Sequence, residues 1–292
     1  MRYCPKELVI LVPATMRVTN HQVPRLGFHR HGKQGKDNNA TCEQSVFHYG
    51  RQLRYWRSDG QIIFLGGSKD CRDGRGFNLW KLAGVLLQQG YEALFIEGDV
   101  ADEASAERAL HTTVTQFGRL DILFNNAGVS AVGDVSECAP DDWGRVIRVN
   151  VWGSYLMGHY AVPIMRKQGQ GTTSSTIAVI GLQSRAAYAA SKGAILALTR
   201  AMAADRSHEN IRVCALLPGT VYTPFVEGYL QRHYADNVGE AIDSLKNRQL
   251  NRELMTPQDV ASAALYLASD EARFAFGTAL IIDGGVSAAK VF

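Results

Sequence analysis

Short apolar runs alternate with amphipathic stretches along most of this chain of 292 residues. Most of the apolar runs end in glycine, proline or asparagine, as strands do where they enter turns. Between the runs, apolar residues recur at the i, i+3, i+4, i+7 spacing of a helix. This alternation predicts an α/β fold, a doubly wound parallel sheet with helices on both faces and with ligands at the carboxyl ends of its strands. The predicted strands are residues 61–65, 93–96, 120–124, 211–217 and 279–283, and one strand that begins at Gly171.

Helix signals are clearest in three stretches. Residues 101–117 place their apolar side chains on one stripe, and residues 141–166 repeat the pattern with Asn150 on the apolar side. Pro163 is expected to bend the second of these helices near its end. Residues 256–259, Thr-Pro-Gln-Asp, predict a helix start with a threonine N-cap, a proline at the first helical position and a capping box.

Tyr188 and Lys192 lie four residues apart in a predicted helix, residues 187–200. Residues at i and i+4 share a helix face, so the phenol and the ammonium are expected one turn apart. A lysine cation beside the phenol favours the phenolate and lowers the tyrosine pKa from its usual value of about 10. Such a pair is suited to general acid/base catalysis. Taken alone the spacing is weak, because tyrosine and lysine are common on helices.

Other motifs stand at the predicted strand ends, and together with this pair the chain resembles the short-chain dehydrogenase/reductase family over roughly residues 61–285. The resemblance implies a single-domain Rossmann-like fold, an NAD or NADP cofactor, and hydride transfer between that cofactor and a secondary alcohol or ketone. Residues 223–228 resemble members that act on sugars or small alcohols. The motifs that carry the resemblance are Asp99-Val100, Asn125-Asn126-Ala127-Gly128, Val149-Asn150-Val151, Tyr188 with Lys192, Pro218-Gly219 with Thr223, and Ile282-Asp283-Gly284-Gly285.

The resemblance also assigns roles to residues of this chain. Tyr188 would transfer the proton of the substrate hydroxyl, Lys192 would assist it and bind the nicotinamide ribose, and Asn150 would help to hold a water. The residues expected to contact the cofactor are Gly66, Gly67, Ser68, Asp99, Val100, Asn126, Ala127, Gly128, Pro218, Gly219, Val221 and Thr223, in addition to Tyr188 and Lys192.

The serine that would bind the substrate oxygen has two alternative positions. Counting back thirteen residues from Tyr188, the separation usual in the family, leads to Ser175. Aligning the strand that begins at Gly171 without gaps leads instead to Ala178, which would leave the site without a serine. We take Ser175 as the candidate. The other candidates are Ser174 and Ser184.

The turn after the first predicted strand departs from the family pattern. Gly66 and Gly67 are present, but Asp70-Cys71-Arg72 follows where further glycines are expected, and a carboxylate there would repel a pyrophosphate. From Gly67 to Asp99 there are 32 residues, too few for two helices and two strands, so one βα step is shortened or lost. The lost part includes the end of the second strand, where the choice between NAD and NADP is normally made. The cofactor preference therefore cannot be derived from the sequence.

Residues 1–60 do not resemble the family. They carry ten Lys or Arg against four Asp or Glu, a net charge of +6, while the whole chain is at +3. Residues 27–39 are polar and lack any period, so we expect this extension to be poorly ordered, to bind no nucleic acid and to be dispensable for folding. Residues 8–13 are apolar but too short for a convincing signal peptide.

Composition limits the remaining classes of function. Five cysteines form no C-x-x-C pair and the histidines have no ligand spacing, so we expect no disulfide framework and no metal site. No apolar run has the length of a membrane span, and a cytoplasmic location is expected. Residues 222–250 mix aromatic and charged side chains and are expected to form a lid over the substrate.

Two further expectations concern activity and assembly. The main alternative to the enzyme is a catalytically inactive scaffold or interaction protein of the same fold, with a damaged cofactor turn. In the resembling family the helices at residues 141–166 and 187–200 pair across a two-fold axis, so a homodimer or homotetramer is expected. Tyr155, Leu156, Leu196 and Leu198 are the apolar residues that this surface would use.

Overall fold

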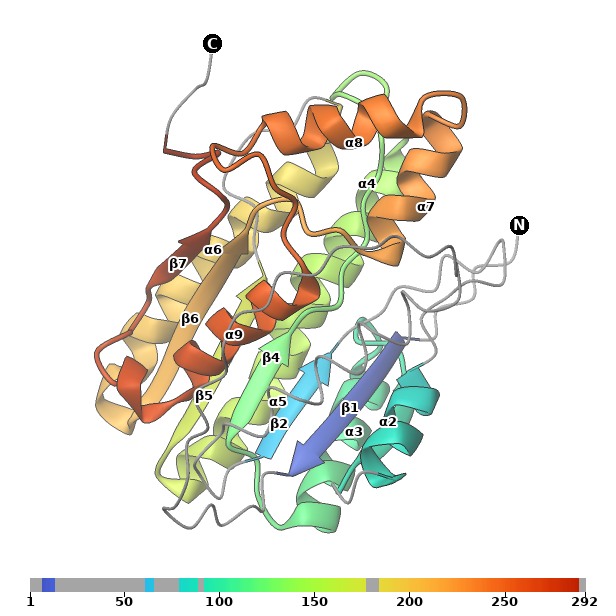
Figure 1. Ribbon diagram of the computed structural model, residues 1–292. Coiled ribbons are helices and arrows are strands. Elements are labelled where there is room, and N and C mark those ends of the chain that lie inside the picture. The colour runs from blue at the N-terminus through green and yellow to red at the C-terminus, as the bar shows by residue number, and fades with distance from the viewer. Residues whose placement is uncertain (1–6, 14–60, 66–78, 89–91, 177–183, 289–292) are drawn as a thin grey trace.

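The computed structural model describes residues 7–13, 61–65, 79–88, 92–176 and 184–288. In these residues seven strands form one sheet, in the spatial order β3-β1-β2-β4-β5-β6-β7 (Figure 1). The strands are β1 (Glu7–Pro13), β2 (Gln61–Leu65), β3 (Leu94–Gly98), β4 (Ile122–Asn125), β5 (Gly171–Thr176), β6 (Ile211–Pro218) and β7 (Ala279–Ile282).

The predicted α/β fold is confirmed. The pairs β2–β4, β4–β5, β5–β6 and β6–β7 are parallel. In Figure 1 α5 and α6 lie behind the sheet and α9 lies in front of it. The helices are α2 (Leu79–Gln88), α3 (Glu103–Phe117), α4 (Pro140–Val146), α5 (Gly153–Gln168), α6 (Ala186–Arg206), α7 (Pro224–His233), α8 (Val238–Asn247) and α9 (Pro257–Ala268).

Burial on both faces explains why the central strands are continuously apolar. All residues of β6 from Ile211 to Leu217 are buried, as is typical of a strand covered by helices on both sides. Successive side chains of β4 point to opposite faces: Leu123 packs with α3 and α5, and Phe124 packs with Val260 of α9. A fully buried leucine contributes about 2 kcal/mol, so the two cores hold the helices firmly on the sheet.

One buried arginine joins β6 to the end of α9. The guanidinium of Arg212 donates hydrogen bonds to the carbonyl oxygens of Leu267 at 2.6 Å and Ser269 at 3.1 Å. The last carbonyls of a helix have no partner within the helix and carry its negative dipole end. A cation from the neighbouring strand therefore caps α9 and fixes its position over the sheet.

The long helix predicted at residues 141–166 is interrupted. It consists of α4, a π-helical turn at Ile147–Trp152 and then α5, which carries Pro163 in its interior. Isolated π-helical turns are uncommon and often stand at functional sites. The interruption contains Asn150, whose side chain bonds to residues far away in the sequence, and periodicity alone does not reveal such a partner.

The N-terminal strand β1 differs from two predictions, the poor order of the N-terminal extension and the parallel direction of all strands in the sheet. Residues 1–60 were expected to be poorly ordered, yet Glu7–Pro13 pairs antiparallel with both β2 and β3. The doubly wound sheet is therefore parallel except for one inserted strand. The predicted loss of a βα step supplies the physical reason, because α2 is the one helix described between β2 and β3 and a place for a strand remains between them. The apolar sequence Glu-Leu-Val-Ile-Leu-Val-Pro fills this place.

The N-terminal strand is consequently expected to contribute to stability, contrary to the expectation that the extension is dispensable. Ile10 lies mid-strand, in register with Phe64 and Phe95. An Ile10→Pro substitution removes a donor from a strand that is paired on both sides, at about 1–3 kcal/mol for the unpaired partner. We expect the thermal midpoint to fall by at least about 3 °C, given about 2–4 °C per kcal/mol at this size.

Ile10→Val, which keeps the backbone N–H and the β-branched side chain, serves as the matched control and should lower the midpoint by less. Equal thermal midpoints for Ile10→Pro and the wild type would show that β1 does not contribute to stability and that residues 1–60 are dispensable for folding.

Candidate active site

The carboxyl ends of the parallel strands gather the predicted site residues at one edge of the sheet. Asp99 and Val100 follow β3, residues 126–128 follow β4, and Gly219 follows β6. In Figure 1 α7 and α8 lie beyond this same edge. In open α/β sheets, ligands bind outside the carboxyl ends of the strands, so this edge is the candidate site.

Tyr188 and Lys192 lie on the first turns of α6, as their spacing predicts. Tyr188 is partly buried and Lys192 is 5% exposed. The Lys192 Nζ atom lies 5.4 Å from the centroid of the Tyr188 ring. This distance is within the range of a cation–π interaction, so the ring face and the ammonium attract each other.

The pKa values of this pair differ from the prediction for Tyr188. Burial raises the pKa of Tyr188, and the charge of Arg185 lowers it by a smaller amount. The expected net lowering by Lys192 is therefore wrong for this state of the protein. Burial lowers the pKa of Lys192 to about 8, because desolvation disfavours the ammonium. At neutral pH Tyr188 is protonated, and Lys192 is still mainly charged.

Asn150 joins three segments around the pair. Its side chain is fully buried, and its Oδ1 atom accepts a hydrogen bond from the Val129 N–H at 2.8 Å. Its Nδ2 group donates to the Val129 carbonyl at 3.0 Å and to Ser191 Oγ at 2.9 Å. Ser191 in turn donates to the Tyr188 carbonyl at 2.7 Å. The π-helical turn is thus tied to the loop after β4 and to α6. The water-holding role of Asn150 stays a prediction.

Three contributors to this arrangement were missed in the sequence. Ser191 supports Asn150, Val129 binds it through its backbone, and Arg185 acts on the Tyr188 pKa. Ser191 could have been noticed as a small polar residue one turn from Tyr188. The contributions of Val129 and Arg185 depend on the contact between the loop after β4 and the start of α6. Such a contact between distant segments cannot be predicted from a local sequence pattern.

Gly128 lies between the amide and the ammonium. A Cβ atom at this position would lie 3.4 Å from Asn150 Oδ1 and 3.7 Å from Lys192 Nζ. A methyl group would already be in van der Waals contact with both, so a larger side chain would displace them. The glycine therefore leaves room for these two buried polar groups at the end of β4.

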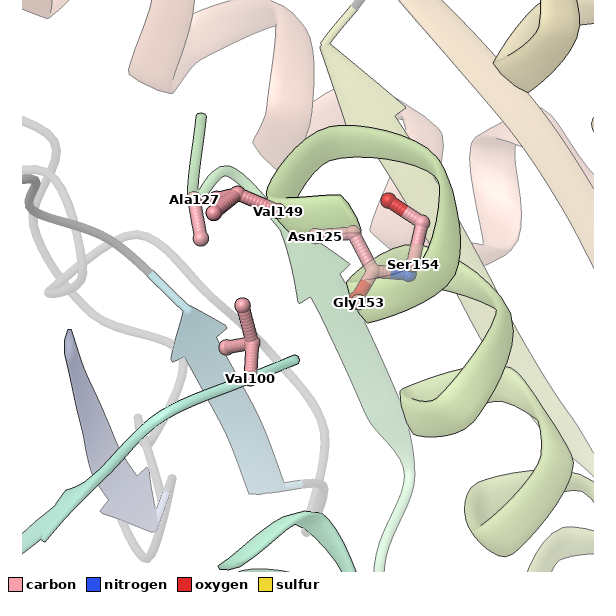
Figure 2. Close-up of a pocket in the computed structure, with 6 residues that line it drawn as sticks. All are labelled: Val100, Asn125, Ala127, Val149, Gly153 and Ser154. Carbon is pink, nitrogen blue, oxygen red and sulfur yellow. The ribbon is translucent and has the colours of Figure 1, made fainter. Parts of the chain in front are cut away.

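A small hollow lies next to these residues, with about 160 Å³ of space that includes open solvent. Figure 2 shows the side chains of Val149 and Ala127 across from Val100, with Gly153 and Ser154 on the helix beside them. The apolar side chains offer a surface for a planar base, and Ser154 and Asn125 add polar atoms. The residues lie at the strand ends where the cofactor is expected, but the hollow as it stands does not admit a water molecule. The residues that line the hollow are Val100, Asn125, Ala127, Val149, Gly153 and Ser154.

Other predicted cofactor residues are placed as follows. Asp99 is buried, and its Oδ1 atom accepts a hydrogen bond from the Ala101 N–H at 2.8 Å, which shapes the turn after β3. Asn126 is exposed. A Cβ atom at Gly219 would lie 2.9 Å from backbone atoms of Asp283, so only glycine fits this approach of β6 to the end of β7.

The start of the lid is anchored at the same edge. Val221 pairs with Met255, and Thr223 is the N-cap of α7, accepting a hydrogen bond from the Val226 N–H at 3.4 Å. Pro218 is the last residue of β6. The predicted lid, residues 222–250, holds α7 and α8, while its mobility stays a prediction.

Several predicted residues cannot be tested in the same way. Gly66, Gly67, Ser68 and Ala178 lie outside the described residues. The backbone of Ser175 pairs with Asn125 and Ala215 near the end of β5, but its side chain is outside the description. The backbone of Ser174 pairs with Phe124 and Cys214. Ser184 stands just before α6, and its carbonyl accepts a hydrogen bond from the Gly133 N–H at 2.9 Å.

Two kinds of site are not seen in the part of the chain that the structure describes. No group of three or more His, Cys, Asp or Glu side chains there could hold a metal ion. No helix among the described residues has the length and apolar character needed to cross a membrane.

Known proteins resemble this chain in sequence. A family model described as Enoyl-(Acyl carrier protein) reductase matches residues 81–287. An uncharacterized oxidoreductase from Thermotoga maritima is 40% identical over 208 residues, covering 70% of this chain and 81% of that protein. Trans-4-hydroxycyclohexanecarboxylate dehydrogenase from Sinomonas cyclohexanicum is 38% identical over 198 residues, covering 67% of this chain and 71% of that protein.

Two further proteins bear on the family and on activity. A Xanthobacter autotrophicus protein named inactive 2-(S)-hydroxypropyl-CoM dehydrogenase 2 is 37% identical over 202 residues, covering 68% of this chain and 87% of that protein. A crystal structure from Burkholderia xenovorans, described as a short-chain dehydrogenase/reductase, has a TM-score of 0.63 and 32% identity, covering 66% of this chain and 74% of that chain. With a family model over more than half of its length and with relatives that match most of it at this level of identity, the chain belongs to the short-chain dehydrogenase/reductase family.

Proposed function

We propose that this chain is an NAD(P)-dependent alcohol dehydrogenase or ketoreductase that acts on a secondary alcohol or its ketone. The observation that carries the proposal is the buried Lys192 ammonium beside Tyr188, at the same strand end as Gly128 and Asn150. A buried lysine is costly, and titratable residues with a pKa shifted by burial cluster at functional sites. A relative named for the oxidation of a hydroxycyclohexane ring supports a secondary alcohol as the substrate class.

The residues of this chain would move one proton. In ketone reduction the Tyr188 hydroxyl, protonated at neutral pH because burial raises its pKa, donates to the substrate oxygen. The positive charge of Lys192 then stabilises the phenolate that forms. In the oxidation direction Tyr188 accepts the hydroxyl proton, which the same charge makes easier. Val100, Ala127 and Gly128 would hold the dinucleotide, and a bound nicotinamide ring supplies or accepts the hydride.

A catalytically inactive scaffold is the second candidate function. Asp70-Cys71-Arg72 places a carboxylate in the expected pyrophosphate turn. One relative of similar identity is named as an inactive dehydrogenase. Against the scaffold stands the retention of Tyr188, Lys192 and Asn150 together, because an inactive fold gains nothing from a buried ammonium.

We also propose that the chain works in the cytoplasm as a homodimer or homotetramer. Trp152 and Tyr155 are 45% and 40% exposed, and their rings lie 5.1 Å apart on the outer side of the interrupted helix. Leu156, expected on this surface, is instead buried in the core between the sheet and the helices. Exposed paired aromatic rings are typical of interfaces between protein chains.

Light scattering at micromolar concentration tests this assembly. A dimer would have twice the mass of one chain, which is 32.0 kDa. A Trp152→Glu substitution should shift the mass toward the monomer, because it places a charge in the proposed contact, and Phe274→Glu on another exposed aromatic should not. A wild-type mass equal to that of one chain, with full activity, would contradict the proposal.

Tyr188→Phe separates the enzyme from the scaffold. In the enzyme kcat should fall at least about 100-fold, the lower end for loss of a general acid/base, while calorimetric binding of the dinucleotide and the thermal midpoint should change little. Tyr160→Phe, which removes a hydroxyl bonded to Glu103 away from the site, is the matched control and should keep full activity. A wild type that binds neither NAD nor NADP, or a variant with unchanged turnover, would end the proposed mechanism.

The two serine positions are separated by Ser175→Ala and Ser184→Ala. Ser175 stands near the end of β5 beside the site edge, while Ser184 holds a left-handed backbone conformation, φ 54°, before α6. If Ser175 binds the substrate oxygen, its variant alone should lose activity, mainly in kcat. Rates near the wild type for Ser175→Ala would favour the alignment with Ala178 and no catalytic serine.

A further inference from the structure

Two arginine side chains lie against the loop after β4, the loop that Asn150 also binds. Arg145 of α4 donates a hydrogen bond to the Ser130 carbonyl at 3.3 Å, and Arg185 donates to the Ala131 carbonyl at 3.4 Å. Both distances exceed the usual range of about 2.7–3.2 Å, so these bonds are weak. Asn150 binds the same loop at 2.8 and 3.0 Å. The loop is therefore held mainly by the amide, and holding it does not explain the two cations.

The two arginines differ in where their charge acts. Arg145 forms an ion pair with Asp142 at 3.1 Å, which offsets its charge. Arg185 stands three residues before Tyr188. Burial raises the pKa of Tyr188, and the charge of Arg185 lowers it by a smaller amount. Because the effect of a charge decreases with distance, the Arg185 guanidinium lies close enough to act on a group that reacts with the Tyr188 hydroxyl.

The backbone around Arg185 is fixed between the loop and the start of α6. Arg185 pairs with Gly133 in an isolated bridge, and the Gly133 N–H donates to the Ser184 carbonyl at 2.9 Å. The Ala186 N–H in turn donates to the Gly133 carbonyl at 3.3 Å. The residue that carries the guanidinium is therefore placed at the Tyr188 end of α6 by three backbone contacts.

The other charges described near this point favour an anion. The first turn of α6 contains no acidic residue, so the positive end of the helix dipole adds to the charge of Arg185. Asp134 lies in the same loop, but its Oδ1 atom accepts hydrogen bonds from the N–H and hydroxyl of Ser136 and from the Glu137 N–H. That carboxylate is directed to the turn that follows it.

We propose that Arg185 binds a carboxylate of the substrate, so that the secondary alcohols and ketones on which this chain acts are hydroxy acids and keto acids. The inference rests on the proposed dehydrogenase function and names its substrate class. The planar fork of a guanidinium matches the two oxygens of a carboxylate. A substrate held by its carboxylate at Arg185 has its hydroxyl end placed at Tyr188. Arg185 selects and orients the substrate, while the proton is transferred by Tyr188.

Calorimetric titration with compounds that cannot react tests the anion site without turnover. The full-length protein is first saturated with whichever of NADH and NADPH it binds, and hexanoate and hexanamide are then compared. The wild type should bind hexanoate at least about 10-fold more tightly, the size expected for hydrogen bonds to a charged group. Arg185→Gln should reduce this preference to less than about 3-fold. Arg185→Lys, which keeps the charge and loses the fork, should lie between the two.

Turnover of matched acids and amides tests the substrate class. The pairs are 3-hydroxybutyrate with 3-hydroxybutyramide, and 5-hydroxyhexanoate with 5-hydroxyhexanamide, two spacer lengths that suit a flexible arginine side chain. In at least one pair, kcat/KM of the wild type should be at least about 10-fold higher for the acid. In Arg185→Gln this ratio should approach one, mainly through a higher KM for the acid, because Arg185 does not contact the reacting atoms.

The matched control is Arg145→Gln. It removes the same side chain from the same loop, where Arg145 binds the carbonyl that precedes the one bound by Arg185. Because the charge of Arg145 is offset by Asp142, the variant should keep the wild-type preference for acids over amides in both experiments.

The outcomes separate this inference from the proposed function. A wild type that binds neither dinucleotide, or that oxidises none of the four alcohols, would overturn the dehydrogenase and with it the substrate class. Dinucleotide binding and turnover with equal kcat/KM for acids and amides would overturn the role of Arg185 alone. An acid preference that survives in Arg185→Gln, or that is lost equally in Arg145→Gln, would also overturn it.

Discussion

The carboxamide of Asn150 holds the candidate active site together. Its three hydrogen bonds join the π-helical turn, the loop after β4 and helix α6. The Asn150 side chain is inaccessible to water, and a buried donor or acceptor left without a partner costs about 1–3 kcal/mol. The π-helical turn places the Asn150 side chain next to Val129. The two hydrogen bonds to the Val129 backbone then fix the position of the neighbouring Gly128. Through Ser191 the same amide reaches the carbonyl of Tyr188.

Within this frame the structure tolerates a costly charge. Burial lowers the pKa of Lys192 from 10.5 to about 8, so the folded protein binds this proton less strongly than the unfolded chain does. The destabilisation is fully present below pH 8 and disappears as the pH rises toward 10.5, because stability increases with pH wherever the unfolded chain binds more protons. At neutral pH the buried charge of Lys192 therefore lowers the stability of the folded protein by its full amount. In the proposed reaction, a phenolate or an anionic substrate oxygen beside Lys192 would reduce this cost.

The features that could be predicted from the sequence are encoded locally. The buried run of β6, the one-turn spacing of Tyr188 and Lys192, and the capping box at Thr256 each follow from neighbours within a few residues, and the structure confirms them. The π-helical turn could not be predicted, because it depends on a tertiary partner of Asn150. The direction of the Tyr188 pKa was predicted wrongly for the same reason: spacing gives the distance to Lys192 but not the depth of burial that raises the pKa.

The strand β1 was missed because its partners are far away in the sequence. Its seven residues are mostly apolar, but the hydrophobic pattern of an isolated strand does not say where or in which direction it pairs. The short interval between Gly67 and Asp99 predicts a shortened or lost βα step, and some other segment has to lie between β3 and β2 if β3 is to stay joined to the sheet. A strand hydrogen-bonded on both sides removes two exposed edges at once, which favours insertion over an open gap. A family pattern with one step absent therefore predicts a replacement strand, and an apolar run elsewhere in the chain is the first place to look for it.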